Sequence, residues 1–151
     1  MPTGSPIVDL AHAIQLAVAP VFLLTGVGAI LNVLTNRLAR IVDRTRVLEE
    51  GDGPVRDAYA TAAELVVLRR RGTLINSAIR FCTFSALLVS GVVAAIFLGT
   101  FVRIDFSLIV AATFVLAMLS LMAGLVSFLR EVQAAIRFVR SHVGSRERPG
   151  R

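Results

Sequence analysis

The side chains of this chain that could support catalysis are few and far apart. His12 and His142 lie near opposite ends of the 151-residue sequence, and neither has a cysteine or carboxylate cluster at the spacing of a metal site. The one cysteine, Cys82, has no partner for a disulfide and is interpreted as a small packing residue. The sequence also lacks a glycine-rich phosphate loop and a nucleophile elbow. We therefore expect no enzyme, no catalytic residue, no metal site and no cofactor.

A row of polar side chains could line a hydrated pathway. At about 100° per residue these side chains share an arc of roughly 100° on one helix. They are Gln15, Thr25, Asn32, Asn36, Arg40 and Asp43. Amides facing lipid are unfavourable, so this polar stripe should face protein or a water-filled space. A pore lined by the first helix of an oligomer meets that requirement. Ordinary hydrogen bonding between helices also meets it, with Asn32 and Asn76 as an interhelical amide pair.

Arginine supplies all 16 basic residues, against 10 acidic residues, and the formal net charge is +6. Several arginines lie near expected cytoplasmic membrane boundaries and are predicted to bind anionic lipid head groups. These are Arg37, Arg69, Arg70, Arg71, Arg80 and Arg130. An anion-attracting vestibule at the mouth of a pore is the alternative. Nucleic-acid binding is not expected, because Tyr59 is the only aromatic residue between Arg37 and Arg80.

Three long stretches carry no formal charge, namely Leu10 to Asn36, Phe81 to Val102 and Phe106 to Leu129. Each supplies the roughly 20 apolar residues that a helix needs to cross about 30 Å of hydrocarbon. The mean hydropathy of +0.77 is typical of a polytopic membrane protein. We predict one all-α membrane domain over residues 1–151, with transmembrane helices at about 13–36, 80–102 and 106–129.

The distribution of arginines sets the expected orientation. Nine arginines lie from Arg37 to Arg80 and six from Arg130 onward, whereas the loop between the second and third spans contains only Arg103. By the positive-inside rule, the N-terminus is outside and the C-terminus is cytoplasmic. The segment before Leu10 carries only Asp9, so the first span is expected to stay attached rather than to be cleaved as a signal peptide.

Residues 37–79 are predicted to form a cytoplasmic helical hairpin. Apolar residues recur at three-four spacing on both sides of the breaker cluster at Gly51–Pro54. No breaker separates the hairpin from the first span, so one helix should run from about Ala13 to Glu50. The same continuity is expected for the other two helices, and residues 141–151 are expected to form a basic tail. The apolar hairpin residues that could contact another copy or a partner are Leu38, Ile41, Leu48, Leu65 and Leu68.

Small residues form two rows in the second and third spans. Gly91, Ala95 and Gly99 make one row, and Ser120 and Gly124 repeat the same spacing. Such rows let helix backbones approach closely, either between subunits or between these two spans of one chain. The second alternative is favoured, because only Arg103, Ile104 and Asp105 separate the spans and make them an antiparallel hairpin.

Four strings of residues resemble a known family. They are Ile14 to Leu24 (IQLAVAPVFLL), Asn36 to Arg44 (NRLARIVDR), Leu74 to Ile79 (LINSAI) and Phe128 to Val132 (FLREV). From about Ile14 to Arg140 the chain is similar to the bacterial domain-of-unknown-function family 2721. The resemblance implies a multi-pass protein of the bacterial inner (plasma) membrane with three spans. It brings no activity, substrate or site residue.

Two functional hypotheses follow. The first is a homo-oligomeric helical assembly that acts as a scaffold or regulatory subunit, with membrane lipids and a cytoplasmic protein as expected partners. The alternative is a small oligomeric ion or solute channel, with the polar stripe of the first helix lining the pore. An ion-coupled pump is not expected, because the spans contain no ionisable side chain apart from boundary groups and Cys82.

Overall fold

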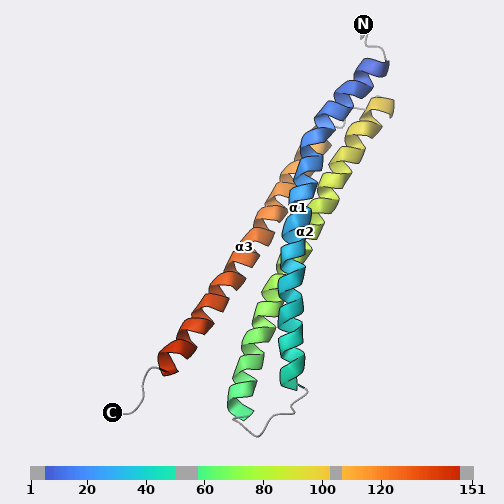
Figure 1. Cartoon of the computed structure of the whole chain (residues 1–151). Helices are drawn as coiled ribbons and strands as arrows, with labels where there is room; N and C mark the ends of the chain where they lie inside the picture. Colours follow the sequence, from blue (N-terminus) through green and yellow to red (C-terminus); the bar gives the residue numbers. More distant parts are fainter. Residues whose placement is uncertain (1–5, 50–57, 103–106, 147–151) are drawn as a thin grey trace.

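The computed structural model describes residues 6–49, 58–102 and 107–146, and each of these segments is a single α-helix (Figure 1). Helix α1 spans Pro6–Glu49, α2 spans Ala58–Val102 and α3 spans Ser107–Arg146. At 1.5 Å per residue the helices are about 60 to 68 Å long. Helix α1 begins at Pro6 rather than near Ala13. Proline is favoured at a helix start because its missing N–H group has no helical partner there. The expected breaker cluster at Gly51–Pro54 and the loop Arg103–Asp105 lie outside the described residues.

Each helix is long and apolar enough to cross a membrane. The candidate spans are Leu10–Glu49, Glu64–Gly99 and Ser107–Ala135, and only 17 to 22% of their most apolar windows is buried inside the molecule. Large apolar side chains such as Phe22, Leu87 and Leu108 therefore face outward. Exposed apolar surface on this scale is stable in lipid rather than in water. The prediction of an all-α protein with three helices of membrane-spanning length is confirmed.

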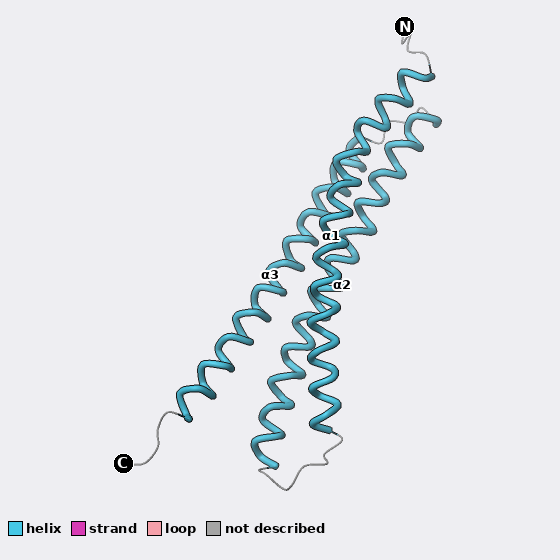
Figure 2. Tube along the Cα trace, in the orientation of Figure 1, coloured by secondary structure: helices cyan, strands magenta, loops and turns pink. Residues whose placement is uncertain are grey.

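Helix α2 packs against both other helices, whereas α1 and α3 contact each other much less. The three helices run together near the N-terminal end of α1, and the C-terminal part of α3 diverges from the α1–α2 pair toward the opposite end (Figure 2). We call the end that contains Glu49, Ala58 and Arg146 the charged end. Helix α3 continues to Arg146, within the segment 141–151 that was expected to form a basic tail.

The α1–α2 contact has the spacing of a coiled coil. Buried positions on α1 are separated by three, four or seven residues. They are Ala13, Ala17, Pro20, Val27, Leu34 and Ile41. Such a row keeps one face of a helix toward its neighbour over many turns. Pro20 lies inside α1 without ending it, which transmembrane helices commonly tolerate.

Small residues bring α2 and α3 close together. The Ser85 hydroxyl donates a hydrogen bond of 2.8 Å to the carbonyl oxygen of Ala117, and the Ser120 hydroxyl donates one of 2.9 Å to the carbonyl oxygen of Phe81. At Gly124 an added Cβ would lie 2.8 Å from Cys82 Sγ. The absence of a side chain at Gly124 therefore permits the close approach, and the two hydroxyl groups cross-link the helix backbones.

Beyond the uncharged stretches, α1 and α2 stay paired toward the charged end. Arg44 Nε lies 2.9 Å from Glu64 Oε1, and Arg69 Nη2 lies 3.5 Å from Glu49 Oε1. These ion pairs are exposed, so each contributes roughly 0–1 kcal/mol. The pairing of these segments agrees with a helical hairpin, whose cytoplasmic location stays a prediction.

The close contact at Gly124 predicts an asymmetry between two glycine substitutions. Gly124→Ala should lower the free energy of unfolding by about 1–3 kcal/mol, because the new methyl group overlaps Cys82 Sγ and crowds the Ala78 carbonyl oxygen. The matched control is Gly91→Ala, where an added Cβ meets nothing within 4 Å. The control should be neutral or stabilising by up to about 1 kcal/mol. The midpoint of detergent-induced unfolding in mixed micelles measures both changes, and equal midpoints would contradict the packing.

Candidate functional site

A carboxylate on α3 is bound by guanidinium groups from both other helices. Glu131 Oε1 accepts hydrogen bonds from Arg71 Nε at 3.1 Å and from Arg71 Nη2 at 2.9 Å. Glu131 Oε2 lies 3.1 Å from Arg37 Nη1. We call this three-residue cluster the ionic junction. It joins α1, α2 and α3 at one level of the molecule.

The carboxylate of the junction is fully enclosed. The Glu131 side chain is 0% exposed, compared with 21% for Arg71 and 34% for Arg37. The guanidinium carbon of Arg37 also lies 5.3 Å from the centre of the Phe128 ring, on the same helix as Glu131. A cation over an aromatic face is attracted to it electrostatically. Arg37 is therefore attached to α3 by two contacts.

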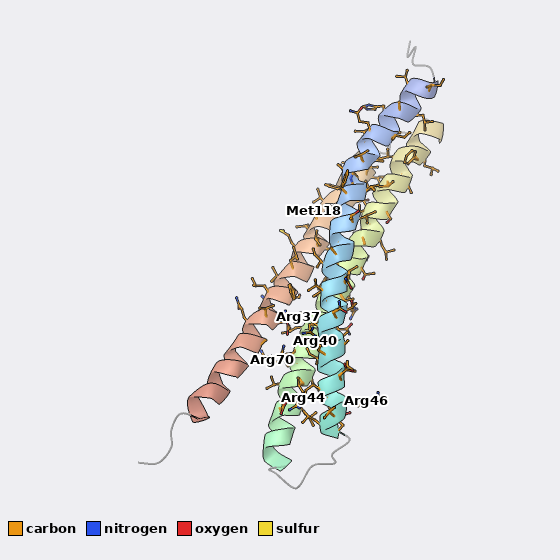
Figure 3. The ribbon with its side chains drawn as sticks, in the orientation of Figure 1. Arg37, Arg40, Arg44, Arg46, Arg70 and Met118 are labelled. Carbon is orange, nitrogen blue, oxygen red and sulfur yellow. The ribbon has the colours of Figure 1, made fainter. Side chains whose placement is uncertain are left out.

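Helix packing positions the three side chains. Glu131 continues the inward-facing row of α3 formed by Ala117, Ser120 and Gly124. It therefore occupies a position that a small or apolar residue would otherwise fill. Arg37 and Arg71 follow the uncharged part of α1 and precede that of α2, so the junction lies at the border between the apolar span and the charged end. In Figure 3, Arg37 and Arg40 are labelled at this border, whereas Met118 lies well toward the uncharged end.

The charges of the junction give it a net charge of +1, from two guanidinium groups and one carboxylate. Removing a carboxylate from water is costly, and the two cations offset that cost: Arg71 donates two hydrogen bonds to Oε1, and Arg37 forms an ion pair with Oε2, which accepts no hydrogen bond within the described residues. The arrangement offers no nucleophile. Across the described residues, no group of histidine, cysteine and carboxylate side chains could hold a metal ion. The junction can fix the level and rotation of three helices and can attract an anion.

The polar stripe predicted for the first helix faces away from the rest of the molecule. Its members Gln15, Thr25, Asn32, Asn36 and Arg40 are all exposed, opposite the buried row of α1. Asn36 Nδ2 donates a hydrogen bond of 3.2 Å to Asn32 Oδ1, and the Thr25 hydroxyl donates to the Val21 carbonyl oxygen. Asn76 is exposed on α2, and no hydrogen bond joins it to Asn32 in the described part of the chain. Pairing of these two amides between helices therefore stays a prediction.

The arginines predicted to bind lipid head groups divide into two classes. Arg37 and Arg71 belong to the ionic junction, and Arg69 pairs with Glu49. The others form no ion pair within the described residues and are exposed, namely Arg70, Arg80 and Arg130. Head-group binding stays a prediction for all of them, and the structure leaves these three most accessible for it.

The two rows of small residues in α2 and α3 differ in burial. Ser120 and Gly124 are buried against α2, as the intramolecular alternative expects. Ala95 and Gly99 are half-buried, and Gly91 is exposed. Among the apolar hairpin residues, Ile41 and Leu68 are buried in the core, whereas Leu38, Leu48 and Leu65 are half-buried. Ile41 and Leu68 are therefore less available to a partner.

A comparison with family models identifies the family. The model described as "Protein of unknown function (DUF2721)" matches residues 17–141. The chain belongs to the DUF2721 family. Comparisons with curated proteins and with solved structures gave no match.

The region matched in this DUF2721 protein contains all three residues of the ionic junction. Sequence analysis missed the junction, although the strings that resemble the family contain Arg37 and Glu131. One signal was available. Glu131 is the only acidic residue between Asp105 and Glu147, and it lies at three-four spacing from Gly124 through Ser127 and Phe128. An isolated acid on an inward-facing row predicts a buried partner of opposite charge.

The junction predicts a large effect of removing its carboxylate from this DUF2721 protein. Glu131→Gln keeps the side-chain shape but leaves two arginines facing each other, so it should lower the free energy of unfolding by about 3 kcal/mol. The matched control Glu64→Gln removes an exposed pair with Arg44 and should cost at most about 1 kcal/mol. Unfolding in mixed micelles, followed by circular dichroism, measures both.

A double-mutant cycle isolates the Arg71–Glu131 pair. If the two residues stabilise the protein through each other, Arg71→Gln combined with Glu131→Gln should cost less than the sum of the single changes. Additive costs would show that the ionic junction is not an energetic unit.

Proposed function

We propose that this DUF2721 protein is a non-enzymatic homo-oligomer of the bacterial inner membrane that acts as a scaffold or regulatory subunit. In this proposal the N-terminus is outside and the charged end is cytoplasmic, because most of the arginines lie there. The observation that carries the proposal is the polar outward face of α1, which includes Asn32 and Asn36. Such a face needs a partner within a membrane.

The outward faces of α1 and α3 differ in chemistry. The outward face of α3 consists of apolar side chains such as Leu116, Leu119 and Met122, and it suits direct contact with lipid. On α1, the exposed face contains Thr25, Asn32 and Asn36 together with Val18 and Phe22. Neighbouring members of this set are three, four or seven residues apart. This is the spacing of a helix–helix seam with polar positions inside it.

The hydrogen-bonding capacity of the amide pair supports self-association. Asn36 Nδ2 donates one hydrogen bond to Asn32 Oδ1, which leaves the side-chain Nδ2 of Asn32 and the side-chain Oδ1 of Asn36 without partners in the described part of the chain. Copies with the same orientation in a membrane present these amides at the same depth. One amide pair then meets its equivalent, and donors and acceptors match in number.

The charged end provides the surface for further partners. Leu38, Leu48 and Leu65 keep part of their surface exposed along the α1–α2 pair, and a cytoplasmic protein is the partner that this surface would take in a regulatory subunit. The exposed arginines Arg70 and Arg130 would contact anionic lipid head groups at the same boundary.

The second candidate function is a channel lined by α1. The observation that favours it is the orientation of the stripe from Gln15 through Thr25 and Asn32 to Arg40, which faces away from the core of the protomer. In a closed ring of copies this stripe would surround the axis, so a scaffold and a channel share the same seam. They differ in whether the axis contains water.

A pair of leucine substitutions tests the oligomer. Asn32→Leu with Asn36→Leu removes the amides and should lower the association constant by about fivefold or more, since such hydrogen bonds contribute about 1 kcal/mol each. Native mass spectrometry from lipid nanodiscs measures the oligomeric mass. The matched control is Asn76→Leu, an exposed amide on α2, which should leave the mass unchanged.

The outcomes separate the two functions. A monomeric wild-type chain, or an oligomer that is equally stable without the amides, would contradict the α1 seam. Conductance in planar bilayers, measured with the wild-type oligomer, decides between the roles. Ion flow that Asn32→Leu alters favours the channel, whereas conductance equal to that of empty bilayers favours the scaffold.

A further inference from the structure

A hollow on the outward face of α2 surrounds an arginine. Its volume is about 570 Å³, and Arg80 lies in it between the hydroxyl groups of Ser77 and Thr83 and the apolar side chains of Phe84 and Leu87. The hollow lies on the side of α2 opposite the buried row of Ala78, Cys82, Ser85 and Val89. It is therefore separate from the ionic junction and from the outward face of α1.

Arg80 lies deeper in the apolar region than the other arginines of the described helices. The hydrogen bond from Ser120 to the Phe81 carbonyl oxygen places it level with Ser120 and Leu121 of α3. The next charged residue of α3 is Arg130, ten positions after Ser120, which corresponds to about 15 Å along the helix. On α1, the packing of Ile41 against Gly72 gives the register, and counting eight positions from each residue places Arg80 level with Val33. Val33 is four positions before Arg37.

No acidic side chain is available to Arg80 at this level. The sequence contains no Asp or Glu between Asp9 and Asp43, between Glu64 and Asp105, or between Asp105 and Glu131. Neighbouring copies with the same membrane orientation offer the same uncharged stretches. Two copies meeting at Arg80 would bring like charges together. The counter-ion of Arg80 therefore comes from outside this chain and its copies.

The hydroxyl groups beside Arg80 are also available. Within the described residues, Ser77 and Thr83 donate no hydrogen bond, although they lie one turn before and one turn after Arg80 on the same face. By contrast, on α2 the Thr73 hydroxyl donates to the Arg69 carbonyl oxygen, and the Ser90 hydroxyl donates to the Ala86 carbonyl oxygen. Arginine with a hydroxyl group on each side matches the phosphate and ester oxygen atoms of a phospholipid.

We propose that the Arg80 hollow is a binding site for one anionic phospholipid. The phosphate group accepts hydrogen bonds from Arg80 and Ser77, and an ester oxygen of the same lipid accepts one from Thr83, which lies about 9 Å further along the helix from Ser77. The side chain of Arg80 extends toward the charged end, where the head groups of that leaflet lie. One acyl chain lies along Phe84 and Leu87, which continue the hollow toward the middle of the membrane. The lipid supplies the charge that the protein lacks at this depth.

Native mass spectrometry of the full chain tests the site. In detergent, the wild-type protein should retain one phosphatidylglycerol more strongly than phosphatidylcholine with the same acyl chains. Arg80→Gln should weaken phosphatidylglycerol binding about tenfold, as expected for hydrogen bonds to a charged group. The matched control is Arg44→Gln, an arginine of α1 that already pairs with Glu64, which should change binding less than about twofold.

Two further double variants test the role of the hydroxyl groups beside Arg80. Ser77→Ala with Thr83→Ala should weaken retention several-fold, whereas Thr73→Ala with Ser90→Ala should not, because those hydroxyl groups already bond to their own helix. Equal loss in the Arg80 and Arg44 variants, or equal retention of the two lipids, would overturn the site. Displacement of the lipid by millimolar inorganic phosphate would overturn the assignment to a phospholipid, because a free anion would then suffice.

Discussion

A carboxylate without access to water is stable only while its cations stay in place. Glu131 is such a carboxylate, and its two cations come from different helices. A shift of α1 or α2 along its axis, or a rotation of either, would leave a buried charge unpaired. That cost is larger than the contribution of any exposed ion pair in the molecule. The ionic junction therefore restrains how three long and otherwise weakly specified helices align.

Two kinds of packing support the junction from opposite sides. Toward the uncharged end, Gly124 and Ser120 hold α3 against α2 at short range. Toward the charged end, α3 diverges from the α1–α2 pair (Figure 1), which continues through the ion pairs of Arg44 and Arg69. The junction lies at the boundary between the part where all three helices pack together and the part where only α1 and α2 are paired. Helices α1 and α2 extend through both parts, and α3 packs closely against α2 only in the apolar part.

The sequence predicted the three helices because long uncharged stretches and breaker clusters are local signals. The partners of the charged residues depend on helix rotation and level, which local signals do not contain. Nine arginines lie from Arg37 to Arg80, and their spacing is equally compatible with solvent, head groups or Glu131. The packing of Gly124 on Cys82 and the hydrogen bonds of Ser85 and Ser120 fix the level of α3 that selects Arg71. Asn32 accepts a hydrogen bond from Asn36 of its own helix, a contact that spacing alone allows but does not require.

The order of the junction residues along the chain bears on biosynthesis. Both arginines, on α1 and α2, are synthesised before Glu131, which lies on the last helix. An insertion intermediate that contains only α1 and α2 therefore carries two neighbouring cations without their shared anion. Insertion of α3 neutralises one of these charges and closes the helix set. A nascent chain that ends before α3 would carry this cationic pair unsatisfied at the membrane border.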